Sequence, residues 1–411
     1  MSLVRPFRGL RPAPGLAQKV AAPPYDVLSS AEARVMAMGN PISFLHVNKP
    51  EIDLPEDINL YDDRVYGQAV ANLRRFIAEG TLVQDPQPWL YVYRQTMGEH
   101  QQYGLMACVS AAEYDSDLIK KHELTRQDKE DDRTRHVSDT DCNAGPVFLT
   151  YRASTEIDAL IAGICARTPD EDFKADDGIG HTLWLVKDVQ AIERLVALFA
   201  AVPLTYVADG HHRSASAARV ARMRREGNPN HRGDEEYNFF LAVLFPHDQL
   251  KILDYNRLVK DLNGLDEETF LGRVGERFEV SPTESPRPAA VHDFGMFLGG
   301  KWYRLRARPG TYPADDPVQS LDVAILQDNL LGPVLGIGDP RKDKRIDFVG
   351  GIRGLGELER RCREGWAVAF ALHPTTVLQL MAVADSGKIM PPKSTWFEPK
   401  LRSGLVVHLL S

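Results

Sequence analysis

The chain has 411 residues, of which 43% are hydrophobic and 26% are charged. This length is too great for one ordinary hydrophobic core, so we expect two or three domains, and the composition excludes general disorder. The 49 basic and 57 acidic residues give a formal net charge of −8, which argues against broad electrostatic attraction to nucleic acid.

The sequence indicates neither disulfide bonds or zinc sites nor a membrane-spanning segment. The four cysteines lie far apart without a CxxC pair, which argues against a zinc site or a disulfide framework. Pro12 and Pro14 precede any apolar run long enough for a signal peptide. The most apolar stretch, Leu195 to Ala208, is too short to span a bilayer. We therefore expect a cytoplasmic protein with no membrane partner.

The first region, residues 1–88, is predicted to be α+β. Pro and Gly dominate residues 5–24, which we expect to form an ordered loop. Ser29 is a hydroxyl cap before an Ala-rich helical run. A second helix is predicted from Tyr66 to Glu79, where apolar residues recur at helical spacing and Gly80 follows as a stop.

Residues 89–260 are predicted to form the catalytic core. Two strands rich in β-formers, Leu90 to Tyr93 and Tyr103 to Val109, indicate a hairpin. Lys120 to Asp141 lacks an apolar stripe. This predicts a mobile or site-lining segment or, alternatively, a solvated helix face with i,i+4 ion pairs.

Later elements follow from periodicity. We predict a strand at 182–187, a helix from Val189 to Ala201, a strand from Leu204 to Ala208, and a strand pair formed by Phe239–Phe245 and Leu250–Tyr255. Residues 261–411 are predicted to be a C-terminal α+β domain, with helices near Glu268–Glu276 and Asp322–Leu330.

The segment Asp209-Gly-His-His-Arg213 lies between a predicted strand and a predicted helix, Ser214 to Arg225. This order favours phosphate binding, because a helix N-terminus offers N–H groups and a partial positive charge. Gly210 permits close backbone approach, and Arg213 can donate two hydrogen bonds to phosphate. His211 and His212 add proton transfer near neutral pH. The alternative is that Asp209 only caps the helix and the histidines are solvated.

Three further segments carry candidate residues. In the polar segment, His122, Glu123, Lys129 and Arg133 place a carboxylate among cations, which suits a general base or a metal ligand. The candidates that would line the site or contact substrate are His122 together with Tyr25, Asp26, Asn256, Arg257, Lys393, Ser394 and Thr395. For Tyr25 and Asp26 the alternative is a plain proline-rich loop, and for the 391–400 segment it is a structural loop.

With these residues in view, the chain resembles a widespread prokaryotic family known only as a domain of unknown function. The resemblance covers almost the whole length and is carried by Ala22–Val27, His122-Glu123 with Lys129 and Arg133, Asp209–Arg213, Asn256-Arg257 and Lys393–Lys400. Through the Asp-Gly-His-His-Arg element alone, that family is similar to the ParB/sulfiredoxin-like superfamily, which includes ParB nucleotide switches and free-serine kinases. This implies an α+β fold with a ParB/sulfiredoxin-like mixed α/β core and additional N-terminal and C-terminal regions.

The resemblance to the kinases implies roles for individual residues. Glu123, Asp209 and His212 would be catalytic, with Glu123 as the base and Asp209 also a metal ligand. Gly210, His211, Arg213, Arg133 and Lys129 would bind nucleotide or phosphate. It also implies Mg²⁺ and a nucleotide, ATP or ADP, as cofactors.

These observations favour a nucleotide-dependent phosphotransferase acting on a small hydroxylated metabolite, with free L-serine as the best single substrate. A P-loop enzyme is disfavoured because the chain has no Walker A sequence. The alternatives are a ParB-like nucleotide-binding switch or regulator and a metal-dependent phosphohydrolase that uses His211 and His212. A nucleic-acid partner is not expected, and a homodimer, the donor and the reaction direction stay open.

Overall fold

The computed structural model describes residues 4–411, which form two compact units. One unit contains the chain up to Leu250 together with Pro399–Ser411, and the other contains Lys251–Glu398. The boundary near residue 260 in the sequence analysis thus differs from the division at 250, and the chain end belongs to the first unit. Pairing of Leu10 with Val407 and of Ala22 with Ser403 holds it there. The division into three domains stays a prediction.

Both units mix helices and strands, so the expected α+β class is confirmed. The helices of the first unit are α1 (Ala17–Val20), α2 (Ser30–Ala37), α3 (Leu45–Asn48), α4 (Asp63–Ala78), α5 (Ala111–Asp115), α6 (Gln127–Thr140), α7 (Thr155–Cys165), α8 (Val189–Ala200) and α9 (His211–Gly227). Its strands are β1 (Val4–Arg5), β2 (Leu10–Pro12), β3 (Leu82–Gln84), β4 (Leu90–Met97), β5 (His100–Ser110), β6 (Ile119–Lys120), β7 (Cys142–Asn143), β8 (Val147–Tyr151), β9 (Glu171–Lys174), β10 (Gly180–Val186), β11 (Thr205–Asp209), β12 (Phe239–Pro246) and β21 (His408–Leu409). None of the helices in residues 4–411 is long and apolar enough to cross a bilayer.

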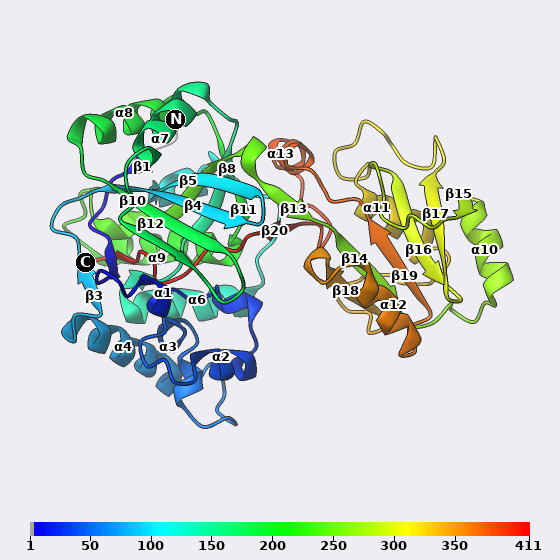
Figure 1. Ribbon diagram of the computed structural model, residues 1–411, viewed down its shortest axis with the longest axis horizontal. Coiled ribbons are helices and arrows are strands. Elements are labelled where there is room, and N and C mark those ends of the chain that lie inside the picture. The colour runs from blue at the N-terminus through cyan, green and yellow to red at the C-terminus, as the bar shows by residue number, and fades with distance from the viewer. Residues whose placement is uncertain (1–3) are drawn as a thin grey trace. The chain divides into compact units, whose positions relative to one another are not determined.

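A nine-stranded mixed sheet forms the centre of this unit, in the order β6-β11-β8-β12-β5-β4-β10-β9, with β1 beside β5 (Figure 1). The predicted β4–β5 hairpin is confirmed, with Met97 paired to His100. The predicted pairing of Phe239–Phe245 with Leu250–Tyr255 is wrong. Strand β12 has β5 on one edge and β8 on the other, so it has no free edge for another strand.

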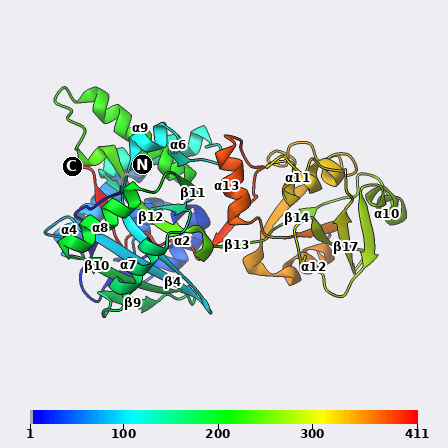
Figure 2. The same cartoon turned by 90° about the horizontal axis from the view of Figure 1, so that it is seen from above.

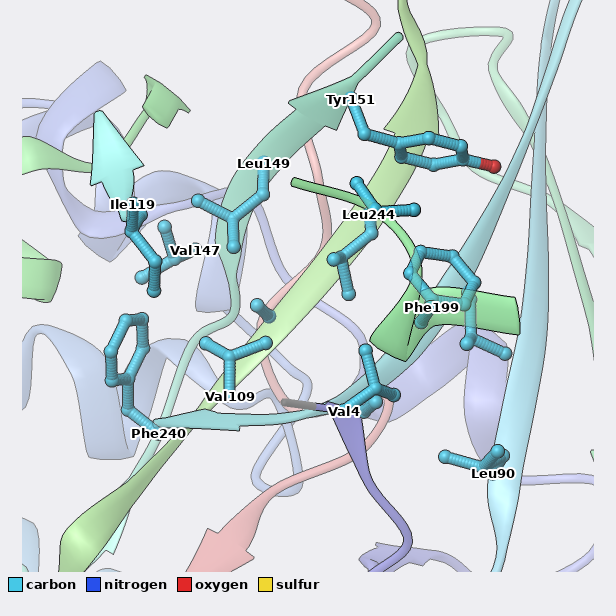
Figure 3. Close-up of a cluster of buried hydrophobic side chains, with 14 of the residues drawn as sticks. Val4, Leu90, Val109, Ile119, Val147, Leu149, Tyr151, Phe199, Phe240 and Leu244 are labelled. Atoms are coloured by element: carbon cyan, nitrogen blue, oxygen red, sulfur yellow. The ribbon is translucent and has the colours of Figure 1, made fainter. Parts of the chain in front are cut away.

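The main core lies on the face of this sheet that helices α7, α8 and α9 cover. Figure 3 shows side chains from several strands, among them Val109, Leu149 and Leu244, gathered with Phe199 of α8. Each is at most 3% exposed. Burying such apolar area is the main favourable contribution to folding, and it fixes β11 and α9, the two elements on which the candidate motif lies.

A second hydrophobic cluster joins the N-terminal helices to the chain end. It includes Phe44, Phe76 and Val407. Helix α4 confirms the helix predicted from Tyr66, and α2 begins with a capping box between Ser29 and Glu32, as the hydroxyl cap predicted. Residues 5–24 are more regular than the expected loop, because β1 pairs with β5 and β2 pairs with β3.

The second unit consists of an antiparallel six-stranded sheet with a small two-stranded ribbon. The larger sheet has the order β15-β17-β16-β19-β14-β18, and the ribbon pairs β13 with β20. Its strands are β13 (Lys251–Leu253), β14 (Tyr255–Val259), β15 (Phe278–Pro282), β16 (Asp293–Leu298), β17 (Lys301–Ala307), β18 (Ile346–Gly350), β19 (Val368–Leu372) and β20 (Trp396–Glu398). Its helices are α10 (Glu267–Gly275), α11 (Asp322–Leu326), α12 (Leu355–Arg363) and α13 (Val377–Asp385). Leu358 of α12 packs on β14 and β19 in a separate core.

Candidate functional site

The glycine turn between β11 and α9 has the strand, turn and helix order that the sequence predicted (Figure 1). The register of β11 against β8 shifts between Val207 and Asp209, and such a bulge re-aims the following side chain. Gly210 is the helix N-cap and has φ 99° and ψ 34°, a left-handed conformation that favours glycine. The helix starts at His211, so the side chains of His211, His212 and Arg213 project from its first turn, while Asp209 is the last residue of β11.

Arg213 is surrounded by oxygen atoms. Its side chain is 10% exposed and lies 3.5 Å from the Asp209 carboxylate and 3.9 Å from that of Asp26. Its guanidinium also donates to the carbonyl oxygen of Pro146. Burial acts to lower the pKa of Arg213, but the two carboxylates hold it above its ordinary value. The side chain is therefore charged and held in place.

Asp209 lies between two cations, because the Nζ atom of Lys400 is also 3.5 Å from its carboxylate. Burial acts to raise the pKa of Asp209, but Lys400 and Arg213 outweigh burial and hold the pKa well below its usual range. The group is a carboxylate at neutral pH, and its main partners are cationic side chains.

A pair of buried histidines lies next to an exposed carboxylate. The rings of His122 and His211 meet edge to face with their centroids 4.4 Å apart. Burial lowers the pKa of His122 to about 4 and that of His211 well below its ordinary value, so both are neutral at pH 7. The Nδ1 atom of His211 lies 3.7 Å from Glu123, whose side chain is 57% exposed.

His212 points to a different partner from His211. Its Nε2 atom accepts a 3.1 Å hydrogen bond from the backbone N–H of Arg126, which is the residue before α6. Helices α6 and α9 lie side by side in both views (Figures 1 and 2). Most of the polar segment predicted at Lys120 to Asp141 is helix α6. The buried face of this helix includes the polar residues Thr134 and His136, which explains why the sequence shows no apolar stripe there.

Tyr25 and Arg133 form a second layer behind Arg213. The guanidinium of Arg133 lies over the Tyr25 ring, 4.2 Å from its centroid, and also pairs with Asp132. Burial, with Asp26 nearby, raises the pKa of Tyr25 to about 12, so the phenol keeps its proton. Tyr25, Arg133 and Arg213 line a cavity of about 30 Å³, which has room for one or two molecules of the size of water.

The remaining predicted residues have other partners within their own units. The Lys129 amine contacts Tyr61, 3.3 Å from its hydroxyl oxygen, instead of the glycine turn. Asn256, Arg257, Lys393, Ser394 and Thr395 all belong to the second unit. The amide of Asn256 bonds Asp254 and the Leu372 N–H, and the Ser394 hydroxyl donates to Pro391, so both side chains hold the local backbone.

The residues of the motif do not make a metal site by themselves. Within residues 4–411, three or more His, Cys, Asp or Glu side chains do not converge as metal ligands anywhere. Asp209 faces two cations, and His211 and His212 face different partners. The residues present therefore do not fit a Mg²⁺ ion held by the protein alone.

Lys400 is the site residue that sequence reasoning did not select. It is the last residue of the 393–400 segment that carries the family resemblance, but it is 191 positions from Asp209. Its backbone carbonyl accepts a 2.9 Å hydrogen bond from the Gln95 side chain, which ties it to β4. The one sequence feature that could have identified Lys400 as a site residue is the family resemblance of the 393–400 segment.

Comparisons with known proteins place the chain as follows. A family described as "Protein of unknown function (DUF1015)" matches residues 4–324. No curated protein matches the chain.

Solved structures resemble the chain only weakly. A mutant free serine kinase in complex with AMP is 12% identical, with a TM-score of 0.36 over 72% of this chain and 87% of its own. A C-terminally truncated SbnI from Staphylococcus aureus is 14% identical, with a TM-score of 0.38 over 71% and 82%. A conserved hypothetical protein from Pyrococcus furiosus is 13% identical, with a TM-score of 0.34 over 73% and 93%.

Proposed function

The chain belongs to the family described as "Protein of unknown function (DUF1015)", and we propose that this member is a nucleotide-dependent phosphotransferase. Its acceptor would be a small hydroxylated metabolite, with free L-serine as the best single candidate. The donor would be ATP or ADP, bound by its phosphates at the glycine turn between β11 and α9.

The observation that carries the proposal is a set of buried nitrogen atoms without hydrogen-bond partners. Among residues 4–411 these include Nδ1 of His122, Nε2 of His211 and Nε of Arg213. Buried polar atoms in folded proteins are almost always bonded, and each exception calls for an explanation. Nε of Arg213 carries a hydrogen and Nε2 of neutral His211 can carry one, whereas Nδ1 of neutral His122 is an acceptor because its other ring nitrogen donates to Val207. The two donors lie in the first turn of α9 and support a ligand rich in acceptor oxygens, and a phosphate group is such a ligand.

The arrangement supplies what phosphoryl transfer needs. Arg213 and Lys400 provide positive charge where negative charge accumulates on the transferred phosphoryl group. Asp209 would position these two cations, because it lies 3.5 Å from each. Positioning and electrostatic stabilisation do most of the work in this reaction class, so the site needs no covalent nucleophile.

Glu123 is the proposed general base. The acceptor hydroxyl oxygen would form a bond to the terminal phosphorus of the nucleotide while the bond to the leaving phosphate oxygen breaks. The hydroxyl proton passes to Glu123, and ADP leaves if the donor is ATP, or AMP if it is ADP. The exposed side chain of Glu123 beside neutral His211 suits a group that must meet an incoming substrate.

The proposed reaction requires Mg²⁺, and removal of Mg²⁺ with a chelator should therefore stop it.

The nucleotide would approach from the open side, where Glu123 and Asp26 are partly exposed. The cavity behind Arg213 is about tenfold too small for a ligand of nucleotide size.

The decisive experiment incubates the pure protein with ATP or ADP, Mg²⁺ and serine, and measures phosphoserine by mass spectrometry. A panel of other small hydroxylated metabolites, assayed in parallel, tests the choice of serine. Asp209→Asn should abolish product formation without unfolding the protein. Asp176→Asn, an exposed aspartate in the turn after β9, is the matched control and should keep full activity. A wild-type protein that binds neither ATP nor ADP and forms no phosphorylated product would end the proposal.

A further inference from the structure

A cavity of about 360 Å³ lies within the second unit. Its walls include Arg257 of β14, Phe348 of β18, and Gln327 and Leu331 from the π-helical turn (Gln327–Leu331) that continues α11. Figure 1 shows β14 and β18 as neighbours in the sheet of this unit. A π-helical turn inside a helix is rare and occurs often at functional sites.

Arg257 is a buried cation without an acidic partner. The residue is 4% exposed, and among residues 4–411 the causes of its pKa shift are burial and Tyr255, with no carboxylate. Its guanidinium donates instead to backbone carbonyl oxygens, those of Tyr255 and Lys393, the latter at 3.0 Å. Burial lowers the pKa of Arg257 to about 10, so it is still charged at pH 7. A buried charge is unfavourable unless it is paired, which points to an anion from outside the chain.

The rest of the cavity is apolar or electrically balanced. The guanidinium of Arg257 lies 5.1 Å from the Phe348 ring centroid, and Leu331 and Pro392 add further apolar wall. Arg341 and Asp339 also line the cavity, but they neutralise one another at 3.0 Å. Arg257 thus supplies the net charge inside.

We propose that the second unit binds a small organic anion, with a carboxylate or phosphate group at Arg257 and an apolar body against Phe348, Leu331 and Pro392. The volume lies within the range of pockets for small organic ligands. This site is separate from the proposed phosphotransfer site, since every residue in it belongs to Lys251–Glu398. It accounts for Arg257, which the sequence analysis selected and the phosphotransfer proposal does not use.

A purely structural role for Arg257 makes a different prediction. Its hydrogen bonds to the carbonyl oxygens of Pro392 and Lys393 could serve only to hold the 391–394 segment. In that case Arg257→Met lowers the melting temperature, and no anion binds to the second unit. The two roles are therefore separated by direct binding measurements.

The test is isothermal titration calorimetry of the full chain with phenyl phosphate, benzoate, inorganic phosphate and benzyl alcohol. We expect phenyl phosphate or benzoate to bind at least tenfold more tightly than benzyl alcohol, and the preferred one identifies the anionic group. Arg257→Met should weaken that binding roughly ten- to hundredfold, the size of a lost charge-assisted hydrogen bond. Arg273→Met, an exposed arginine of α10 whose side chain is 61% exposed, is the matched control and should bind like wild type.

Two further variants keep the test decisive. If Arg257→Met does not fold, Phe348→Ala should weaken phenyl phosphate binding while leaving inorganic phosphate unchanged, because it removes only the apolar wall. Arg213→Ala should retain the binding, which separates this site from the glycine turn whether or not the phosphotransferase proposal holds. The inference is overturned if no probe binds to wild type, if Arg257→Met or Phe348→Ala binds as wild type does, or if Arg213→Ala abolishes binding.

Discussion

Replacing Gly210 by alanine should damage the glycine turn in two separable ways. The backbone at this position has φ +99°, which side-chain-bearing residues rarely adopt. The new Cβ atom would also lie 3.1 Å from both Nε and Cζ of Arg213. The Arg213 guanidinium would therefore have to move by a few tenths of an ångström, although it is held by Pro146 and Asp209.

The two effects have different magnitudes. A left-handed backbone conformation costs an L-residue roughly 1 to 2 kcal/mol. Weakening one hydrogen bond of Arg213 adds about 0.5 to 1.5 kcal/mol. We therefore expect Gly210→Ala to destabilise the protein by about 1.5 to 3.5 kcal/mol, the sum of the two costs. It should also weaken nucleotide binding about tenfold through the displaced guanidinium.

Gly233 provides a matched control. Its φ is +97°, nearly the same as that of Gly210, but a Cβ atom there would meet no atom within 4 Å. Gly233→Ala should thus show the conformational cost of roughly 1 to 2 kcal/mol alone, with unchanged nucleotide affinity. The measurements are urea unfolding followed by circular dichroism and calorimetric titration with ADP. Equal destabilisation of the two variants, with equal nucleotide affinity, would refute the reasoning.

Four further predictions concern Glu123, Arg213 and Lys400 at the glycine turn and Asp322 in the second unit. Glu123→Gln should lower kcat by about 10²- to 10⁴-fold with little change in nucleotide affinity, and an unchanged kcat would exclude Glu123 as the base. Arg213→Ala should weaken nucleotide binding by roughly 1.5 to 3 kcal/mol, with partial rescue by lysine; salt-sensitive duplex binding without any affinity for ATP or ADP would instead favour a DNA-associated regulator. Lys400→Met should move the acid limb of the activity profile to higher pH, because the carboxylate of Asp209 loses a cation and its pKa rises; an unmoved limb would contradict this. Burial raises the pKa of Asp322 to about 7 in the folded protein, so the folded state keeps a proton that the unfolded state loses, and stability falls as pH rises from about 4 to 7. The free energy of unfolding of Asp322→Asn relative to that of wild type should therefore increase by about 2 to 4 kcal/mol between pH 4 and pH 8, as measured by urea unfolding. A difference between the two proteins that does not change with pH would count against a protonated Asp322 in the folded state.

Local patterns in the sequence determined the elements that carry the motif. The apolar periodicity from Val189 to Ala201 predicted α8, and the short β-forming run after it predicted β11. The Ala-rich segment predicted α9, although that helix begins three residues earlier than Ser214, so that His211, His212 and Arg213 lie in its first turn. These features depend on residues close in sequence, which is why they were visible there.

The pairing of distant strands was decided only by the tertiary structure. The run from Leu250 suggests a strand, but nothing near it in the sequence indicates β20 as the partner of β13, more than 140 positions later. The neighbours of β12 could not be predicted from its own sequence either, because they depend on how the whole sheet buries its apolar faces. A register or partner is specified by burial across the whole sheet, so a local pattern does not contain it.

The amino-acid sequence already shows which chemical groups are concentrated at one turn: a carboxylate, two histidines and an arginine beside a glycine. The protonation of these groups and their partners depend on the folded chain. It buries His122 against His211 and brings Lys400 to Asp209 from the far end of the chain. It also places Arg257 in the second unit, away from any acidic side chain that could pair with it. The physical reason is that burial and nearby charges set a pKa, and both arise from residues that are distant in sequence and meet only in the folded protein.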